Sequence, residues 1–134
     1  MEIREAIHRD DALLRQLLEL WERSVRATHT FLSPAEIAAI RNDVPQALES
    51  VPHLLVAWEA GSPAGFLGAD GERLEMLFLD PDHRGRGIAP ELLRKAVEHR
   101  VGKGMDCLLG VPDNDSLYLY YRKVANLQEA FYTR

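Results

Sequence analysis

A short glycine-rich segment carries the strongest chemical signal in the sequence. It consists of Arg84, Gly85, Arg86, Gly87, Ile88 and Ala89. The segment follows an apolar stretch at 74–79 and leads into a helical pattern, so unpaired N–H groups of the first helical turn would point into it. Such amides and the helix dipole bind anions, and glycine lets the backbone approach a ligand closely. We therefore expect an anion site here, with the two arginines adding positive charge.

Two common phosphate-binding motifs do not fit this segment. The sequence contains no GxxxxGK[ST] pattern, and Lys95 lies too far along the helix to serve in one. Proline occupies position 90, where a dinucleotide-binding motif would have its third glycine. On the segment alone, a solvated surface turn remains the alternative interpretation.

The elements around the segment predict one α/β or α+β domain over residues 1–134. Asp10 and Asp11 would cap a first helix of about four turns, and Ser33 with Glu36 a second, which Pro45 ends or bends. Apolar positions and turn residues place the remaining elements. The expected strands are 2–7, 54–58, 64–68, 74–79 and 107–111, and the later helices are 89–100 and 117–124.

Composition narrows the function. The chain has 134 residues, 46% hydrophobic and 28% charged, which is typical of a globular domain. Its net charge of -5 argues against non-specific binding to nucleic acid. The single Cys107 excludes an intramolecular disulfide, and no His or Cys spacing indicates a metal site. Without a membrane-length apolar run or an apolar signal segment, we expect a cytoplasmic protein that does not bind membranes.

Two motifs resemble the GNAT superfamily of N-acyltransferases. Arg84-x-x-Gly87-x-Ala89 matches the acyl-CoA signature [RQ]-x-x-G-x-[GA] of that family. Further along, Asn114-x-x-Leu117-x-x-Tyr120-Tyr121-x-Lys123 is close to its N-x-x-A-x-x-[LF]-Y-x-K pattern. The stretch from Trp21 to Leu32 also resembles small bacterial members, so the likeness covers residues 2 to 124.

The resemblance implies a fold and a cofactor. The fold is a central mixed, mostly antiparallel sheet with flanking helices, in which the parallel strands 74–79 and 107–111 splay apart. Acetyl-CoA is the implied donor, its pyrophosphate held by N–H groups from 84 to 89 and its pantetheine between the splayed strands. The implied pantetheine contacts are the amides of Met76, Leu77, Phe78 and Leu79, with Asn114.

The implied chemistry is direct attack of an amine on the thioester in a ternary complex. Glu75, the one charge in its apolar strand, is the leading general base, since burial would make it a better base near neutral pH; the alternative is an exposed residue near the strand's start. Tyr121 matches the family tyrosine that protonates the leaving thiolate, and its alternative is core packing. Because no enzyme nucleophile is required, Cys107 is interpreted as a buried strand residue.

The resemblance further implies a primary amine acceptor on a small molecule or a peptide. Trp21, His29 and Phe31 are the expected acceptor contacts, although His29 beside another aromatic residue is also compatible with a structural role. The amine itself is not identified by the sequence.

The sequence departs from the family near its C-terminus. Val124-Ala125-Asn126-Leu127 replaces a glycine–aromatic pair, and Gln128 to Arg134 is too short for a complete closing hairpin. We expect truncated C-terminal strands and an exposed sheet edge that could form a homodimer. The alternative functions are a CoA-binding module without turnover and, less favoured, a nucleotide-binding domain that uses the same loop.

Overall fold

The computed structural model describes residues 1–28, 32–70 and 73–102. Over these residues the element order is β1 (Glu2–Glu5), α1 (Asp11–Thr28), α2 (Pro34–Arg41), α3 (Val44–Ser50), β2 (His53–Glu59), β3 (Ser62–Asp70), β4 (Arg73–Leu79), the 3-10 helix η1 (Pro81–His83) and α4 (Ile88–Gly102). The predicted strand at 107–111, the helix at 117–124 and the truncated C-terminal strands lie outside the described residues.

The described strands form one antiparallel sheet in the order β1-β2-β3-β4. A tight turn joins β2 to β3, and Ala60 and Gly61 adopt φ values of 50° and 82° there. The β3–β4 pairing is irregular, because Gly68 lies opposite Met76 while the next residue of β3 lies opposite Leu74. Glu75 is thus an extra residue on β4, a β-bulge.

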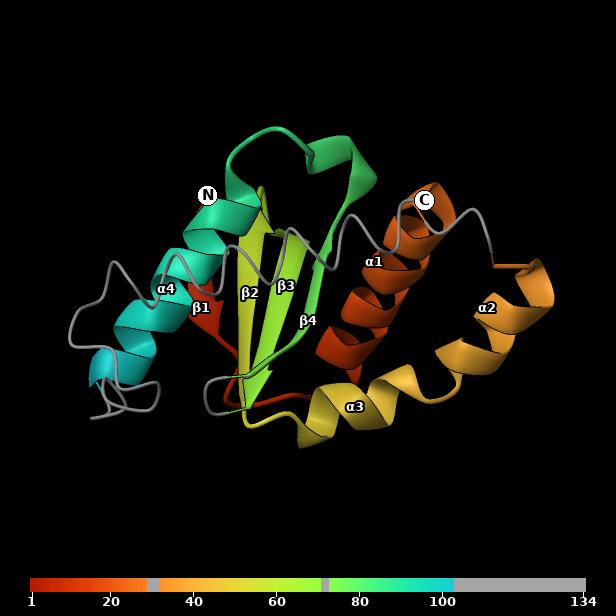
Figure 1. Cartoon of the computed structure of the whole chain (residues 1–134), viewed down its shortest axis with the longest axis horizontal. Helices are drawn as coiled ribbons and strands as arrows, with labels where there is room; N and C mark the ends of the chain where they lie inside the picture. Colours follow the sequence, from red (N-terminus) through yellow and green to blue (C-terminus); the bar gives the residue numbers. More distant parts are fainter. Residues whose placement is uncertain (29–31, 71–72, 103–134) are drawn as a thin grey trace.

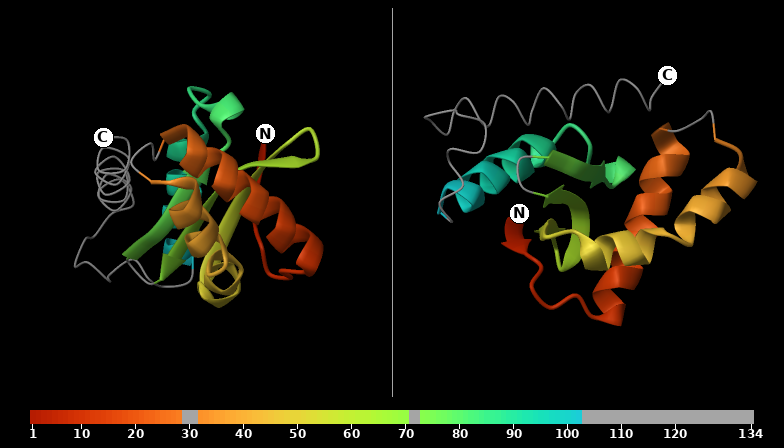
Figure 2. Two further views of the ribbon diagram at one scale, coloured as in Figure 1. Left: turned by 90° about the vertical axis from the view of Figure 1, so that its right-hand side faces the viewer. Right: turned by 60° about the horizontal axis from the view of Figure 1, so that its bottom comes forward.

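Helices cover both faces of the sheet. Figure 1 and the right-hand view of Figure 2 show α4 on one side and α1, α2 and α3 on the other. Side chains alternate between the faces along each strand, so Leu55 and Ala57 of β2 pack with α4, whereas Leu54 and Val56 pack with the other helices. This alternation produces two apolar cores, one on each face.

Local signals determine where α2 and α3 begin. The Ser33 hydroxyl accepts a hydrogen bond from the Glu36 N–H, and the Glu36 carboxylate accepts one from the Ser33 N–H, which confirms the predicted capping box. These hydrogen bonds hold the pKa of Glu36 below its ordinary value of 4.5. Pro45, expected to end or bend this helix, instead lies in the first turn of α3, where a missing N–H costs nothing.

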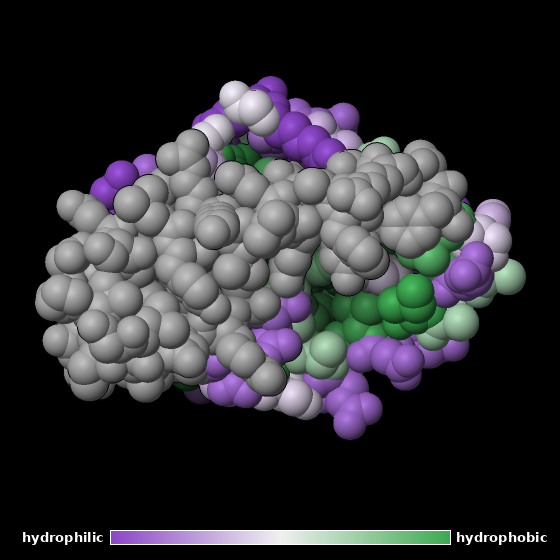
Figure 3. Space-filling view, in the orientation of Figure 1, coloured by the Kyte–Doolittle hydropathy of each residue, from purple (hydrophilic) through white to green (hydrophobic). Residues whose placement is uncertain are grey.

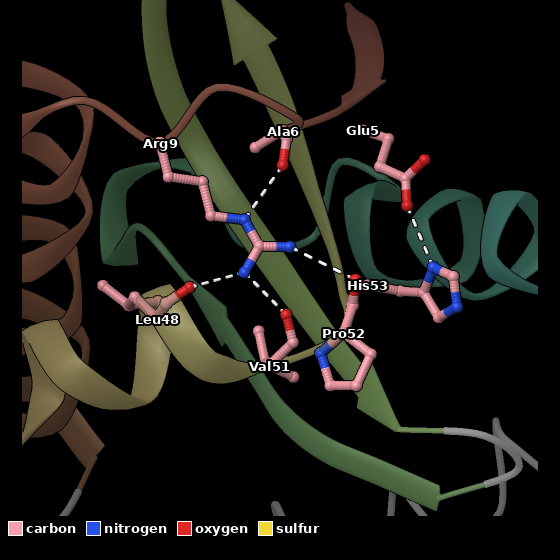
Figure 4. Close-up of polar contacts among 7 residues, drawn as sticks. All are labelled: Glu5, Ala6, Arg9, Leu48, Val51, Pro52 and His53. Carbon is pink, nitrogen blue, oxygen red and sulfur yellow. Dashed lines mark hydrogen bonds and ion pairs between the residues drawn. The ribbon is translucent and has the colours of Figure 1, made fainter.

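Arg9 ties the start of α1 to the end of α3. Its guanidinium donates to main-chain oxygens, and Figure 4 shows most of these contacts. The acceptors are Ala6 at 2.9 Å, Leu48 at 2.8 Å, Glu49 at 3.1 Å, Val51 at 2.6 Å and Pro52 at 3.3 Å. Burial lowers the pKa of Arg9 from its ordinary value, and the nearby Glu5 opposes this shift. The Glu5 carboxylate lies 3.0 Å from His53 Nδ1, a contact drawn in the same view.

β4 corrects one expectation. Its apolar sequence predicted a strand covered on both faces, but Glu75 is exposed and residues 76–79 are only half-buried. The reason is its place in the sheet: among the residues that the structure describes, β4 pairs with β3 and has no strand on its other side. We call this unpaired side the outer edge of β4.

Candidate functional site

The predicted anion site is a loop from Asp80 to Gly87 that joins β4 to α4. We call it the β4–α4 loop; it crosses the end of the sheet at the top of Figure 1. Gly85 and Gly87 both adopt φ of 77°, the left-handed region that favours glycine. A Cβ at either position would meet nothing within 4 Å, so backbone angle and not space requires glycine. The structure thus uses the conformational freedom of glycine at both positions.

The loop delivers its backbone to the start of α4. The Gly87 carbonyl accepts a 3.3 Å hydrogen bond from the Glu91 N–H, the first bond of the helix, and Ile88 anchors that turn in the core with 2% of its side chain exposed. The N–H groups just after Gly87 therefore belong to the unpaired first turn. Arg84 and Arg86 are exposed, and the described surface of this region is hydrophilic in Figure 3.

The outer edge of β4 adds main-chain donors beside the loop. The Asp80 N–H donates to the Ala64 carbonyl at 2.8 Å, so it points toward β3. Because main-chain groups of successive residues point to opposite edges of a strand, the N–H groups of Phe78 and Met76 also face β3. Those of Leu77 and Leu79 face the outer edge. The expectation of available amides over 76–79 is thus narrowed to these two residues.

Glu75 lies on the same strand but in a different setting from the expected one. Its side chain is exposed and it occupies the bulge, so its predicted burial is wrong. Of the two interpretations left open by the sequence, the structure has the exposed residue near the strand's start. A carboxylate there can still exchange protons with water, and its role as general base stays a prediction.

Sequence reasoning missed a charged pair under the loop. Asp80, 8% exposed, accepts a 3.0 Å hydrogen bond from Arg23 of α1, and its other carboxylate oxygen accepts one from the Asp82 N–H at 3.0 Å. The second contact is an Asx turn, which Asp80-Pro81 could have indicated. Nothing in the local sequence indicated the partner 57 positions away.

Of the residues expected to contact the acceptor, the structure describes only Trp21. Trp21 is 5% exposed and packs in the core between the sheet and α1–α3, which corrects its predicted role as an acceptor contact. The helical spacing that placed Trp21 on the apolar stripe of α1 already favoured packing. The other predicted site residues His29, Phe31, Asn114 and Tyr121, with Cys107, lie outside the described residues.

Two further searches concern the described residues. No group of three or more His, Cys, Asp or Glu residues among them is placed to hold a metal ion. None of their helices is long and apolar enough to span a membrane. Over the part of the chain that the structure describes, the candidate site comprises main-chain donors, the two exposed arginines and the Arg23–Asp80 pair.

Comparison with known proteins identifies the family of the chain. Residues 14–125 match the sequence pattern of the Acetyltransferase (GNAT) family. The chain belongs to the GNAT family. The predicted membership of the GNAT superfamily is thereby confirmed.

Individual relatives support the same assignment. The chain is 39% identical over 82 residues to peptidyl-lysine N-acetyltransferase YjaB of Salmonella typhimurium, covering 61% of this chain and 57% of the relative. It is 33% identical over 110 residues to YjaB of Escherichia coli, covering 81% and 72%. This GNAT chain thus spans little more than half of the Salmonella relative's length.

Solved structures share the fold. The solution structure of apo YjaB from Escherichia coli superimposes with a TM-score of 0.63 at 33% identity and covers 74% of this chain and 67% of that one. A PaiA N-acetyltransferase from Thermoplasma acidophilum in complex with coenzyme A gives a TM-score of 0.60 at 22% identity, covering 78% and 76%. The described elements are thus a GNAT-like α+β fold with an antiparallel four-stranded sheet.

Proposed function

We propose that this GNAT chain transfers the acetyl group of acetyl-CoA to the ε-amino group of a lysine residue in a peptide or protein. The observation that carries the proposal is the β4–α4 loop, whose two left-handed glycines lead into an open helix start. Two relatives at 33% and 39% identity are named peptidyl-lysine N-acetyltransferases, which supports a lysine acceptor over a small-molecule amine.

The β4–α4 loop and the outer edge of β4 would each bind a different part of the cofactor. N–H groups from Arg84 to Ala89 hold the diphosphate, which suits the anion preference of a helix start. The N–H groups of Leu77 and Leu79 hydrogen-bond the pantetheine arm. The donor nearest the thioester also polarises its carbonyl, which stabilises the oxyanion that forms on attack.

The reaction then needs no covalent intermediate on the protein. The neutral lysine nitrogen attacks the thioester carbon, the C–N bond forms and the C–S bond breaks. The amine proton passes to Glu75 through water, which its exposure permits, and the thiolate takes a proton from Tyr121. A phenol with a pKa of about 10 is close enough to an alkyl thiol for this transfer.

Several finer predictions remain part of the proposal. Asn114 contacts pantetheine, and the strand at 107–111 splays from β4 to receive it. His29 and Phe31 line the acceptor entrance. A single domain over 1–134, a cytoplasmic location and a homodimer through the C-terminal sheet edge complete the picture.

The decisive experiment is an acetylation assay on lysine-containing peptides, followed by thiol release and by mass spectrometry of the product. Wild-type protein should acetylate lysine in an acetyl-CoA-dependent manner, and Glu75→Gln and Tyr121→Phe should each lower kcat by about 100-fold, typical for the loss of one proton-transfer group. Arg86→Glu with Gly87→Asp should abolish CoA binding, because carboxylates would face the diphosphate.

The outcomes separate the rival functions. CoA binding without transfer to any lysine peptide or amine would indicate a binding module without turnover. A response to ATP equal to that to CoA would favour a nucleotide-binding domain. Full CoA binding by the Arg86→Glu, Gly87→Asp protein would show that the diphosphate binds elsewhere.

A further inference from the structure

The start of the β4–α4 loop is held by one buried carboxylate. The Asp80 side chain is 11% exposed, and its Oδ2 accepts from Arg23 Nη2 at 3.0 Å. Its Oδ1 accepts from the Asp82 N–H at 3.0 Å. His83 Nδ1 lies 3.8 Å from Oδ2, too far for a hydrogen bond. The Asp80 side chain thus connects α1 with the first turn of the loop.

The main chain of Asp80 makes two more bonds. Its N–H donates to the Ala64 carbonyl of β3 at 2.8 Å, and its carbonyl accepts from the His83 N–H at 2.9 Å. At the far end of the loop, Ile88 is buried under the sheet. Between these two anchors the residues from Arg84 to Gly87 are exposed. Their path therefore depends on how firmly Asp80 is held.

The charge of Asp80 also matters for an anion. A buried carboxylate at the base of a loop that receives a diphosphate would repel it, and the low local dielectric strengthens the repulsion. The Arg23 guanidinium offsets this charge at 3.0 Å. Arg23 therefore both holds the start of the β4–α4 loop and neutralises the charge of Asp80.

We propose that Arg23 is a positioning residue for cofactor binding, which acts through Asp80 on the loop that holds the CoA diphosphate. The inference rests on the proposed function, because CoA supplies the diphosphate. It assigns a role in donor binding to a residue on a different element from the loop and strand that carry the donor contacts.

A double-mutant cycle on Arg23→Gln and Asp80→Asn tests this role through the Kd for CoA, measured by calorimetry. Arg23→Gln leaves the carboxylate uncompensated and should raise Kd by about tenfold, or about 1.4 kcal/mol. Asp80→Asn keeps an oxygen for the Asx turn and removes the charge. The double variant should bind within about threefold of wild type, since it removes the uncompensated charge while the two amide side chains can still hydrogen-bond to each other and hold the loop. The effects of the two substitutions would then be non-additive.

Arg26→Gln is the matched control. Arg26 lies three residues after Arg23 on α1, and its side chain is 50% exposed against 49% for Arg23. It pairs with Glu22 at 3.3 Å and not with the loop. Its Kd for CoA should stay within about twofold of wild type. Arg23→Lys, which keeps the charge, should recover most of the affinity lost in Arg23→Gln.

A second probe separates positioning from loss of folding. S-acetyl-pantetheine carries the thioester without the diphosphate, so Arg23→Gln should leave its kcat/KM unchanged. Equal loss of affinity for CoA and of kcat/KM for S-acetyl-pantetheine, with a lower Tm, would overturn the inference. So would unchanged CoA binding in both single variants while wild type binds CoA, and that result would leave the proposed function standing. Failure of wild type to bind CoA would overturn both.

Discussion

Gly85 and Gly87 contribute a backbone angle to the loop. Each has φ of 77° with open space where a Cβ would lie. A Cβ at either position would thus meet no neighbour. The free-energy cost of an alanine there would come from the left-handed backbone alone. The backbone angles of these glycines determine where the N–H groups at the start of α4 lie.

Alanine substitutions can separate this angle from general stability. We expect Gly87→Ala to lower the free energy of unfolding by about 1 kcal/mol and to weaken CoA binding, because relaxation of φ would move the adjacent N–H groups. Urea denaturation and calorimetry measure the two effects.

The turn between β2 and β3 offers the matched control. Gly61 has φ of 82° and equally open surroundings, but it lies outside the β4–α4 loop. Gly61→Ala should lose similar stability and leave the Kd for CoA unchanged. A similar loss of CoA affinity in both variants would contradict a local role for the loop angle.

Residue-level prediction from sequence succeeded where one residue type has a distinctive property. Glycine at 85 and 87 allowed close approach of the backbone, and the structure has left-handed backbone at both. Trp21 was expected at the acceptor from the family resemblance, whereas its place on the apolar stripe of α1 packs it in the core. Arg23 was missed because its partner Asp80 is distant in sequence, and only the folded chain brings them together.

The end of α3 is held by one side chain from outside the helix. Arg9 donates to oxygens at the end of α3 and in the following connection, among them Leu48 and Val51. These carbonyls have no partner within their own helix, so the guanidinium supplies donors that the end of a helix lacks.

We expect Arg9→Lys to lower the free energy of unfolding by about 2 kcal/mol. Lysine keeps the charge but cannot reproduce the planar fork that reaches several carbonyls. Urea denaturation provides the measurement, and Arg15→Lys, on the exposed side of α1, is the control. Because α3, to which Arg9 donates, lies at the opposite end of the sheet from the β4–α4 loop (Figure 1), the Kd for CoA should not change. Retention of full stability would show that the fork contributes little.

The capping box of α2 predicts a pH dependence. The Ser33 hydrogen bonds lower the pKa of Glu36 below 4.5 in the folded state, so its ionised form is favoured by folding. The resulting stability is present above the unfolded pKa and disappears as pH falls through the folded pKa. Urea denaturation from about pH 6 to about pH 3 should therefore show the advantage of wild type over Glu36→Gln shrinking toward acid pH.

The control for the loss of one charge is Glu19→Gln, on the exposed side of α1. A constant difference between wild type and Glu36→Gln across this range would contradict the assignment.

Element starts were predictable where the signal is local. Ser33, Pro34 and Glu36 lie within one turn and together determine how α2 begins. The extent to which β4 is buried was not predictable from its sequence. Its apolar side chains point to alternate faces of the sheet, and this pattern is the same in a central strand and in an edge strand. Its place at the edge depends on pairing with β3, which local sequence does not encode.

At the scale of the whole molecule, β4 contributes side chains to two separately packed cores and leads into the β4–α4 loop. β4 contributes Met76 and Phe78 to the core with α1, and Leu77 and Leu79 to the core with α4. A ligand held between the outer edge of β4 and the start of α4 would contact both sides of this junction. Its binding should therefore oppose unfolding of the chain as a whole.

We expect acetyl-CoA at 100 times its Kd to raise the free energy of unfolding by about 2.7 kcal/mol, whereas ATP at the same concentration should not. Thermal and urea denaturation with each compound provide the measurement. Stabilisation by ATP to the same extent would contradict recognition of the pantetheine arm.

The bulge at Glu75 has a consequence for how this sheet tolerates change. In a strand without a bulge, a shift of one residue in register moves every later residue by one position. Each side chain then changes to the other face, and each N–H group changes to the other edge. Here the register changes at Glu75, between Leu74 and Met76, so the phase of the four residues after the bulge is set by their own pairing with β3. The edge toward which the N–H groups of Leu77 and Leu79 point therefore depends on that pairing.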